Sequence, residues 1–388
     1  MKAIYIDHNA TSRLRPSARD RWLELQGDAW ANARSLHGPG VGARRALETI
    51  VEGTARALGA RPSEVIFTSG ATESNHSALR SVTLELQGET PVRWAVGAGE
   101  HPSVFMALDE LTERGLATQR VVGLLPSGQV DLADLEDALG RCDALCLQVA
   151  NHETGALTDL GAVGERVRAH GVAWHADAVQ AIGRMPFRFD SDETQMITSS
   201  SVSGHKLGGP GGVGLLFWRR GRPFRPLLPE SGAQTGPRAG TPDVPGVGAT
   251  LQALEESLEE LERGLMADHR ALRDALEASL CQGFPGAIVH GVTGARLDNT
   301  LSISLPTAHG GWPDGEELVI ELATRGLSVS TGAACATRSG APSPVLTAMG
   351  VSPEVAAASL RMSLGHGTRH GDLGAILSIL QEVMESIA

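Results

Sequence analysis

Short apolar runs alternate with longer amphipathic segments between about residues 60 and 220. Several of these runs are continuous rather than alternating, which is typical of strands covered on both faces of a sheet. The pattern predicts strands at residues 65–68, 93–96, 119–122, 144–149, 172–177, 196–198 and 213–218, and helices at 43–58, 105–114, 132–139 and 160–169. Alternation in this order indicates an α/β fold with a mostly parallel sheet.

The pattern changes after residue 220. Glycine and proline are too frequent at 221–250 for one regular element. Leucines then recur in steps of three and four from Leu251 to Leu265, which predicts one long amphipathic helix. The rest of the chain has the pattern of a smaller α+β unit and ends in a helix at about residues 373–384.

The chain is long enough for two domains. It has 388 residues, of which 41% are hydrophobic, and a single core rarely grows to this size. We expect a large α/β domain at residues 15–250 and a small α+β domain at 251–388, which also includes the N-terminal residues 1–14.

Charge and hydropathy exclude some classes of partner. Lys and Arg number 33 and Asp and Glu number 45, so the net charge is −12. A chain this acidic has no overall attraction for nucleic acid or for an anionic membrane. The N-terminal residues contain no apolar run of the signal-peptide kind, and no stretch is long and apolar enough to span a membrane. We therefore expect a cytoplasmic protein.

The cysteines and histidines do not form a recognisable metal or disulfide pattern. The four cysteines are Cys142, Cys146, Cys281 and Cys335. They are too few for a disulfide framework, and they lack the paired spacing of a zinc site. His366 and His370 stand four residues apart, but Gly367 between them disfavours the helix that such a metal site needs. We expect free thiols and no metal.

One lysine lies in a segment suited to covalent chemistry. Lys206 follows small and hydroxyl-bearing residues and precedes a glycine-rich loop in the stretch SSSVSGHKLGGPGGVG at 199–214. A lysine that forms an imine needs an uncharged amine and room for a flat ring. Ser203 and His205 are placed to donate to a phosphate, and the glycines let the backbone approach a ligand. The alternative is a surface loop with a solvated lysine.

An aspartate ends a strand upstream of this lysine. Asp177 closes the apolar run VAWHAD, and Gln180 follows three residues later. A carboxylate at the carboxyl end of such a strand points into the usual ligand crevice of an α/β sheet, where it can keep a pyridine nitrogen protonated. The alternative is an aspartate that caps the next helix. Together, Asp177 and Lys206 favour a site for pyridoxal phosphate.

A second turn between a strand and a helix can bind phosphate. Residues 67–75 read FTSGATESN, which supplies free backbone N–H groups and hydroxyls. The segment lacks the GK[ST] ending of a nucleotide-binding P-loop. Residues 38–43 match GxGxxA, but no strand precedes them, so we expect no dinucleotide site there.

Several segments occur together in an order that resembles one known family. They are YIDHNAT at 5–11, NARSLH at 32–37, FTSGATESN at 67–75, EHPSV at 100–104, NHETG at 151–155, HADAVQ at 175–180, SGHK at 203–206, RAGT at 238–241, STGAACAT at 330–337 and SLRMSLG at 359–365. These segments resemble the cysteine desulfurases within the class V aminotransferases. The resemblance implies a fold-type I pyridoxal-phosphate enzyme, with a large domain built on a mostly parallel sheet and a smaller α+β domain that carries a catalytic cysteine loop.

The resemblance implies a role for each residue that would hold the cofactor. Lys206 would bind it covalently, Asp177 would pair with the pyridine nitrogen, and Gln180 would bond the phenolic oxygen. His101 would stack on the ring and move protons. The phosphate would be held by Ala71, Thr72, Ser203 and His205, and by Thr241 of a neighbouring subunit, which implies a homodimer.

The resemblance also implies the substrate and the reaction. Arg361 would clamp the carboxylate of L-cysteine, a task that suits a guanidinium group, and the segment of Asn32 would contribute to the substrate pocket. Cys335 would receive the substrate sulfur as a persulfide while L-alanine is released, and the sulfur would pass to an acceptor protein. A lone cysteine is more often a small buried hydrophobe, but the small residues around Cys335 do not favour that role.

Two positions depart from the family pattern. His152 replaces an asparagine, and a neutral imidazole at this position can still donate to the cofactor's phenolic oxygen. Thr235 replaces an acidic residue, which leaves the preference for substrate or partner open.

Two other functions remain possible for the chain: a selenocysteine lyase or other class V β-lyase, or a catalytically silent scaffold with this fold. The sequence does not identify the acceptor, which leaves iron–sulfur assembly, RNA thiolation and cofactor synthesis open.

Overall fold

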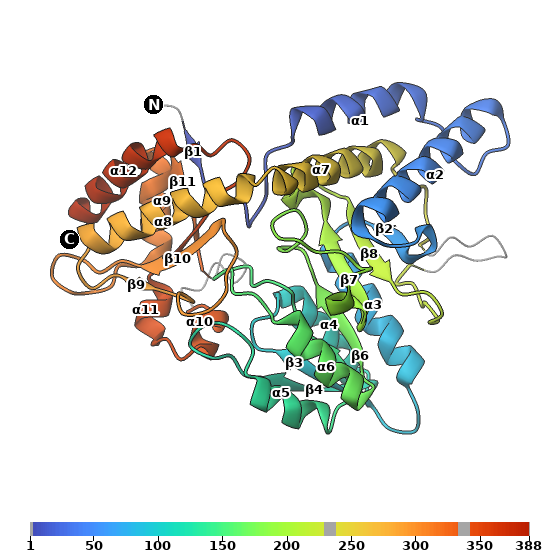
Figure 1. The fold of residues 1–388 in the computed structure, drawn as a ribbon, viewed down its shortest axis with the longest axis horizontal. Helices are drawn as coiled ribbons and strands as arrows, with labels where there is room; N and C mark the ends of the chain where they lie inside the picture. Colours follow the sequence, from blue (N-terminus) through green and yellow to red (C-terminus); the bar gives the residue numbers. More distant parts are fainter. Residues whose placement is uncertain (1–2, 229–237, 333–341, 388) are drawn as a thin grey trace.

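The computed structural model describes residues 3–228, 238–332 and 342–387. The predicted roles of Cys335 and Thr235 therefore lie outside the described residues. Figure 1 shows two parts side by side, one around a large sheet and one containing both termini. Among the described residues, no helix is long and apolar enough to cross a membrane.

A seven-stranded sheet forms the centre of the larger part. Its strands, in spatial order, are β2 (Val65–Thr68), β8 (Gly214–Trp218), β7 (Ile197–Ser203), β6 (Ala173–Asp177), β5 (Ala144–Cys146), β3 (Val92–Gly97) and β4 (Ala117–Val122). β8 runs antiparallel to both of its neighbours, and the remaining pairs are parallel. The predicted α/β fold with a mostly parallel sheet is confirmed.

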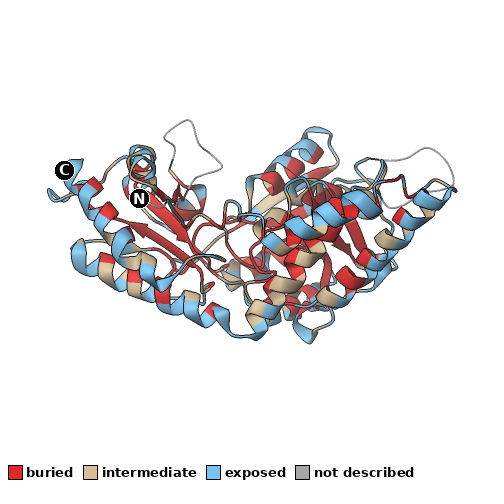
Figure 2. Cartoon of the chain, turned by 90° about the horizontal axis from the view of Figure 1, so that it is seen from above, coloured by how far each residue is buried: buried red, intermediate tan, exposed pale blue. Residues whose placement is uncertain are grey.

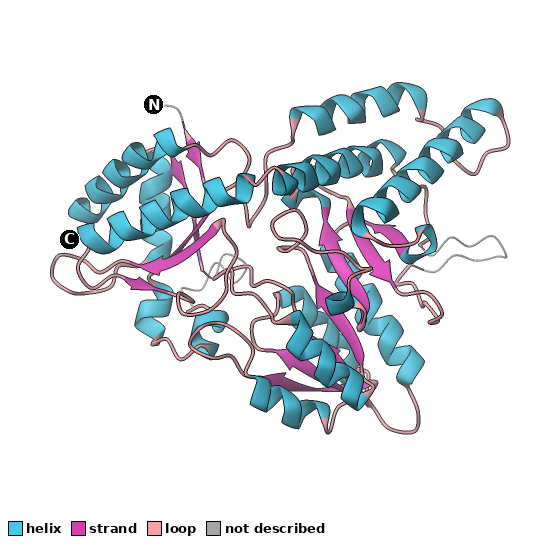
Figure 3. Cartoon of the chain, viewed as in Figure 1, coloured by secondary structure: helices cyan, strands magenta, loops and turns pink. Residues whose placement is uncertain are grey.

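Helices cover both faces of this sheet (Figure 3). They include α2 (Gly38–Leu58), α3 (Ala71–Leu86), α4 (Pro102–Glu113), α5 (Leu132–Leu139), α6 (Leu160–His170) and α7 (Val244–Glu262), and α1 (Pro16–Asp28) packs on α7. Neighbouring strand residues belong to opposite cores: Leu145 packs with α5 and α6, whereas Cys146 packs with α3 and α4. Both faces are buried, which is why the strand segments read as continuous apolar runs.

The predicted single helix from Leu251 to Leu265 is wrong. Two helices, α7 (Val244–Glu262) and α8 (Leu265–Gly283), meet at Gly264, whose φ is 77°. This left-handed conformation suits glycine and ends the helical hydrogen bonding although the leucine spacing continues across it. α7 begins inside the segment expected to be irregular, because Pro245 in its first turn loses no helical hydrogen bond. The predicted domain boundary at 250 lies within α7, and the division of the chain into domains stays a prediction.

The smaller part is built on two further sheets. One has the order β12 (Ser330–Thr331), β13 (Ser359–Ser363), β10 (Thr300–Ser304) and β9 (Ile288–Val289), and the other pairs β1 (Ile4–Tyr5) with β11 (Leu327–Ser328). The helices here are α8, α9 (Gly315–Thr324), α10 (Pro344–Ala348), α11 (Pro353–Ala357) and α12 (Leu373–Ser386). Short 3-10 helices complete the chain at η1 (Pro62–Glu64), η2 (Asp192–Thr194), η3 (Gly204–Lys206) and η4 (His370–Asp372).

The buried residues form a separate core in each part (Figure 2). The core of the smaller part combines β10, β13, α8, α9 and α12 with Ile6 from the N-terminal segment. The chain after β1 crosses from this core to the larger part, where Arg15 donates to the carbonyl of Leu207. Residues 6–15 therefore pass between the two parts, next to the carboxyl ends of β6 and β7.

Candidate functional site

A cavity of about 550 Å³ lies at the carboxyl ends of β6 and β7. Asp177 ends β6, Ser203 ends β7, and parallel strands of an α/β sheet place ligands at this edge. The cavity brings together most of the predicted site residues, which are Ala71, Thr72, His101, His152, Asp177, Gln180, Ser203, His205, Lys206 and Arg361.

Lys206 lies in η3, directly after β7. Its Nζ donates to the carbonyl oxygens of Asn9, at 2.6 Å, and Ala10, at 2.5 Å. A Cβ added at Gly204 would lie 2.8 Å from Oγ1 of Thr250, so a glycine is needed for η3 to pack against α7. The local sequence thus turns the lysine toward the cavity, and the N-terminal segment holds its amine.

Asp177 is nearly buried, with 8% of its surface exposed. Its Oδ2 accepts a hydrogen bond from Nδ2 of Asn75 at 3.1 Å, and its Oδ1 accepts one from the backbone N–H of Val179 at 2.9 Å. Asn75 also bonds Nε2 of His175 through its Oδ1, at 3.0 Å. This chain of contacts fixes the orientation of the carboxylate that faces the cavity.

Two imidazoles stand edge to face beside the cavity. The ring centroids of His101 and His152 are 5.5 Å apart, with planes at 68°. Burial, followed by the charge of Lys206, lowers the pKa of His101, and Asp177 opposes this shift. Burial and the neighbouring His101 place the pKa of His152 well below its usual value. Both rings are therefore uncharged near neutral pH.

The start of α3 lies at the cavity, where the motif FTSGATESN predicts a phosphate cradle. Ala71 and Thr72 line the cavity in the first turn of this helix. A Cβ added at Gly214 would lie 2.5 Å from the backbone of Gly70, so β8 and this turn meet closely only because residue 214 is glycine. His205, on the other side of the cavity, bonds Oγ1 of Thr11 at 2.9 Å, and burial lowers its pKa to about 4. Backbone N–H groups at a helix start bind anions well.

Arg361 extends from β13 of the smaller part to the cavity. It is 3% exposed. Its Nη2 donates to Oδ1 of Asp7 at 2.9 Å, and its Nη1 donates to the carbonyl of His152 at 3.1 Å. Its Nε has no partner among the described residues. The guanidinium thus keeps a donor for a further group at the cavity.

Three buried polar atoms of cavity-lining residues lack a hydrogen-bond partner among the described residues. They are Oε1 of Gln180, Nδ1 of His152 and Nε of Arg361. Buried polar atoms without partners are rare in proteins, so a polar ligand is expected to supply the missing contacts. An amine, a carboxylate, a donor set for phosphate and a space for a ring meet here, and these residues fit pyridoxal phosphate.

Two predicted residues lie outside this cavity. Thr241 lines a neighbouring surface cavity of about 390 Å³, together with Arg34 and Arg238. Asn32 is exposed, and its Oδ1 accepts a hydrogen bond from the backbone N–H of Arg34. Their roles at the cofactor and the substrate need a second copy of the chain or movement of this loop, and they stay predictions.

The sequence analysis missed Asn9, which connects the two parts at the site. Asn9 is 1% exposed. Its Nδ2 donates to the carbonyl of His152 and to Oγ1 of Thr300, and its Oδ1 accepts a hydrogen bond from Arg184. Its backbone carbonyl accepts from Lys206 and from Gln180. The motif YIDHNAT contains Asn9, but its partners are too distant in the sequence for the motif to reveal them.

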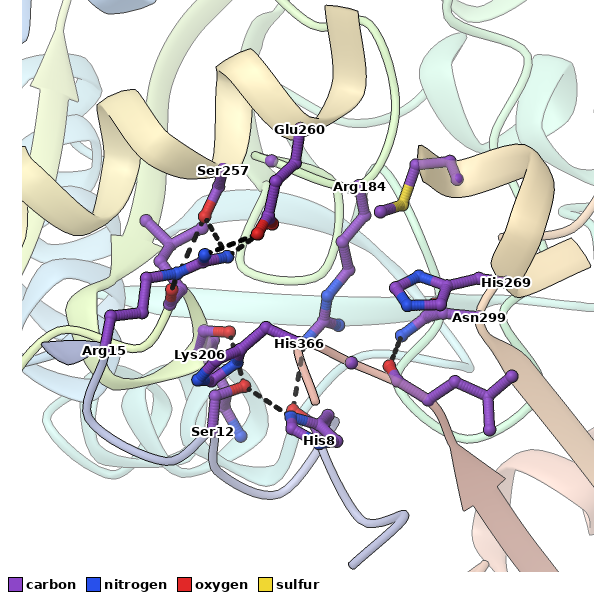
Figure 4. A pocket seen from close by; sticks show the side chains of 15 residues that line it. His8, Ser12, Arg15, Arg184, Lys206, Ser257, Glu260, His269, Asn299 and His366 are labelled. Carbon is purple, nitrogen blue, oxygen red and sulfur yellow. Dashed lines mark hydrogen bonds and ion pairs between the residues drawn. The ribbon is translucent and has the colours of Figure 1, made fainter. Parts of the chain in front are cut away.

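A second cavity, of about 40 Å³, is lined in part by Lys206 and Leu207 (Figure 4). His8, His269, His366 and Arg184 line it, and it is large enough for one or a few water molecules. The rings of His8 and His366 are 5.6 Å apart. In the described part of the chain, no group of His, Cys, Asp or Glu side chains is arranged to hold a metal ion.

His175, fully buried on β6, makes the stability of the fold sensitive to acid. Burial lowers its pKa from 6.5 to about 3. Between these values the unfolded chain binds a proton that the folded chain does not, so stability decreases as pH falls below 6.5. We expect His175→Asn to reduce the slope of the free energy of unfolding against pH, below pH 6.5, by roughly 1.4 kcal/mol per pH unit. The measurement is urea unfolding at pH 5, 6 and 7. His8, whose pKa is also lowered to about 3, and His205 and His290, whose pKa values are lowered to about 4, should keep a pH dependence in the variant.

Comparisons with known proteins agree with this geometry. The model of the aminotransferase class-V family matches residues 4–376. The chain is 34% identical over 388 residues to a cysteine desulfurase of Nostoc sp., covering 100% of this chain and 94% of that protein. A solved NifS-like protein superposes with a TM-score of 0.87 at 30% identity, over 99% of this chain and 100% of that one. The NifS-like protein of Rickettsia africae gives a TM-score of 0.84 at 26% identity, over 99% of each chain. The chain belongs to the aminotransferase class-V family and, within it, to the cysteine desulfurases.

Proposed function

We propose that this chain converts L-cysteine to L-alanine with pyridoxal phosphate, and that the sulfur is transferred to Cys335 and then to an acceptor protein. The family is pyridoxal-phosphate-dependent. The observation that carries the proposal is that Lys206, Asp177, His101 and Arg361, from four separate segments, line one cavity.

The residues at the cavity divide the task of holding the cofactor. Lys206 would bind it as an imine, and Asp177 would pair with its ring nitrogen. Gln180 and His152, each with an unpartnered buried atom, would bond its phenolic oxygen. Its phosphate would be held by Ala71, Thr72, Ser203 and His205, with Thr241 of a second copy in a homodimer. When bound, the cofactor supplies an electron sink for bond cleavage next to the amino group.

The protein's own groups would bind the substrate and move its protons. Arg361 would hold the substrate carboxylate, with its Nε available for that contact. The amine of Lys206 would be the base near the substrate, and the uncharged ring of His101 would be a proton donor. The backbone N–H of Ser103 donates to Nδ1 of His101, so the neutral ring carries its proton on Nε2. The ring is thereby fixed in one tautomer.

The sulfur step needs a nucleophile. The Cys335 thiolate would attack the substrate Sγ and form an S–S bond, while the substrate Cβ–Sγ bond breaks. The electron pair of that bond stays on Cβ, which gains a proton and leaves as alanine. The persulfide on Cys335 then passes its outer sulfur to an acceptor thiolate.

Replacing Cys335 by serine tests this function. Alanine release from L-cysteine should fall by about 10³-fold or more, the scale expected when a nucleophile is removed, while the visible absorbance of the bound cofactor should remain. Cys281→Ser is the matched control, because Cys281 is an exposed thiol on α8, and it should keep full activity.

Three other results of these measurements would each favour a different function. Unchanged alanine release in Cys335→Ser would favour a β-lyase that needs no thiol. Activity toward selenocysteine alone would favour a selenocysteine lyase. A colourless and inert wild-type protein would favour a scaffold with this fold.

A further inference from the structure

Glu153 is a buried carboxylate next to the site for which neither the sequence motif nor the proposed reaction gives a role. It follows His152 in the loop after β5 and is 3% exposed. The backbone N–H groups of Glu153 and Thr154 both donate to Oδ1 of Asn151, at 2.9 Å each. This turn directs the side chain away from the large sheet and toward the smaller part of the molecule.

The contacts of Glu153 lie on both sides of residues 333–341. Its Oε2 accepts a hydrogen bond from Oγ of Ser343 at 2.5 Å. A Cβ added at Gly332 would lie 3.0 Å from the same oxygen, so the carboxylate packs against the backbone there. Ser343 also accepts from the N–H of Leu346 and so caps α10. Gly332 directly precedes the segment 333–341 that contains Cys335, and Ser343 lies two residues after it.

The same carboxylate also faces the cavity side. Its Oε1 lies 3.7 Å from Nε2 of His152. Among the described residues, the titratable or charged groups that face Glu153 are His152, from its own loop, and Arg361, from β13. His152 is uncharged near neutral pH, and Asp7 partly neutralises Arg361. The negative charge of Glu153 is therefore fully compensated only when Ser343 donates its hydrogen bond to the carboxylate.

We infer that Glu153 is a positioning residue for sulfur transfer: its ionised carboxylate holds Gly332 and Ser343, on either side of the Cys335 segment, and so affects the rate at which Cys335 reacts. This inference rests on the proposed function. A charged acceptor makes a hydrogen bond about twice as strong as a neutral one, so protonation of Glu153 weakens its hold on Ser343. Burial raises the pKa of Glu153 to about 7, so both forms exist at physiological pH.

Glu153→Gln tests the inference, because glutamine has the shape of the protonated, uncharged form. At pH 6 the variant and the wild type should release alanine at similar rates, since the wild-type carboxyl is then mostly protonated. At pH 8 the variant should be about tenfold slower, because only the wild type has the charged acceptor. A general packing defect would lower the rate equally at both pH values, and that result would overturn the inference.

A second readout does not depend on turnover. The rate at which iodoacetamide alkylates Cys335 in the holoenzyme, followed by peptide mass spectrometry, should be the same in variant and wild type at pH 6. The two rates should differ by about threefold or more at pH 8. If the wild type releases no alanine but this pH-dependent difference is present, the proposed function fails while the link between Glu153 and the segment stands. If the ratio of the alkylation rate in the variant to that in the wild type is the same at pH 6 and pH 8, the link between Glu153 and the segment is contradicted.

Two further variants complete the test. Ser343→Ala removes the hydrogen bond through which Glu153 holds residue 343, so the variant should lose most of the wild-type advantage at pH 8 and should resemble Glu153→Gln. The same substitution added to Glu153→Gln should change the rate little further. Glu165→Gln, on the exposed face of α6, is the control for loss of one negative charge and should behave as the wild type. A Ser343→Ala variant that keeps the wild-type rate at pH 8 would also contradict the inference.

Discussion

A Lys206→Ala protein, purified with pyridoxal phosphate and dialysed, is expected to be colourless and to release alanine from L-cysteine at least about 10³-fold more slowly than the wild type. The covalent bond to the cofactor needs a primary amine, and Lys206 supplies the amine at this cavity. The measurements are the visible absorbance of the dialysed protein and the rate of alanine formation.

Lys206→Arg separates the covalent role of Lys206 from its structural role. Nζ of Lys206 donates to the carbonyls of Asn9 and Ala10, so alanine leaves two carbonyls without this donor. That loss should lower the free energy of unfolding by roughly 1–3 kcal/mol. Arginine keeps a positive charge and donors but forms no imine, so Lys206→Arg should retain more stability and still be colourless. A coloured, active Lys206→Arg protein would show that the cofactor is bound elsewhere.

Asp177→Asn is expected to keep the colour of the protein but to lower alanine formation by about 10²–10³-fold, the scale seen when one preorganised electrostatic partner is lost. Lys206 is intact in this variant, so the cofactor still binds. An amide cannot stabilise a protonated ring nitrogen as a carboxylate does, and the electron sink is weakened.

The surroundings of Asp177 make the substitution harder to accommodate. Both carboxylate oxygens accept hydrogen bonds, from Asn75 and from the N–H of Val179. An asparagine amide would place its NH₂ group against one of these two donors, and a small loss of stability is expected. The test is kcat for alanine formation together with the visible spectrum. Turnover within about threefold of the wild type would remove Asp177 from its assigned role, because the expected loss is far larger.

Predictions from the sequence were accurate where the signal is local or repeated. The continuous apolar runs predicted the strands of the large sheet because both faces of that sheet are buried. The leucine spacing from Leu251 to Leu265 misled the prediction of one helix. Periodicity reports which side of a helix is apolar, whereas the backbone of Gly264 decides where the helix ends.

The candidate site was predicted only in part from the motifs. Lys206, Asp177 and Arg361, which line one cavity, were predicted as site residues because few other side chains suit the chemistry assigned to them. Asn9 and Glu153 were missed because they act by holding other groups. Asn9 lies 171 residues from Gln180 in the sequence, and Glu153 lies 190 residues from Ser343. Hydrogen bonds across such separations leave no periodic or local trace in the chain.

The sequence by itself determined the α/β class of the fold, the family and the residue types able to carry out the reaction. These properties follow from side-chain chemistry and from apolar patterning over short windows. The tertiary structure alone decided that the N-terminal segment holds the lysine, that Asp7 pairs with Arg361, and that Glu153 lies between the cavity and the ends of the Cys335 segment. The physical reason is that these contacts form only when the two parts pack together, and their geometry depends on the whole chain.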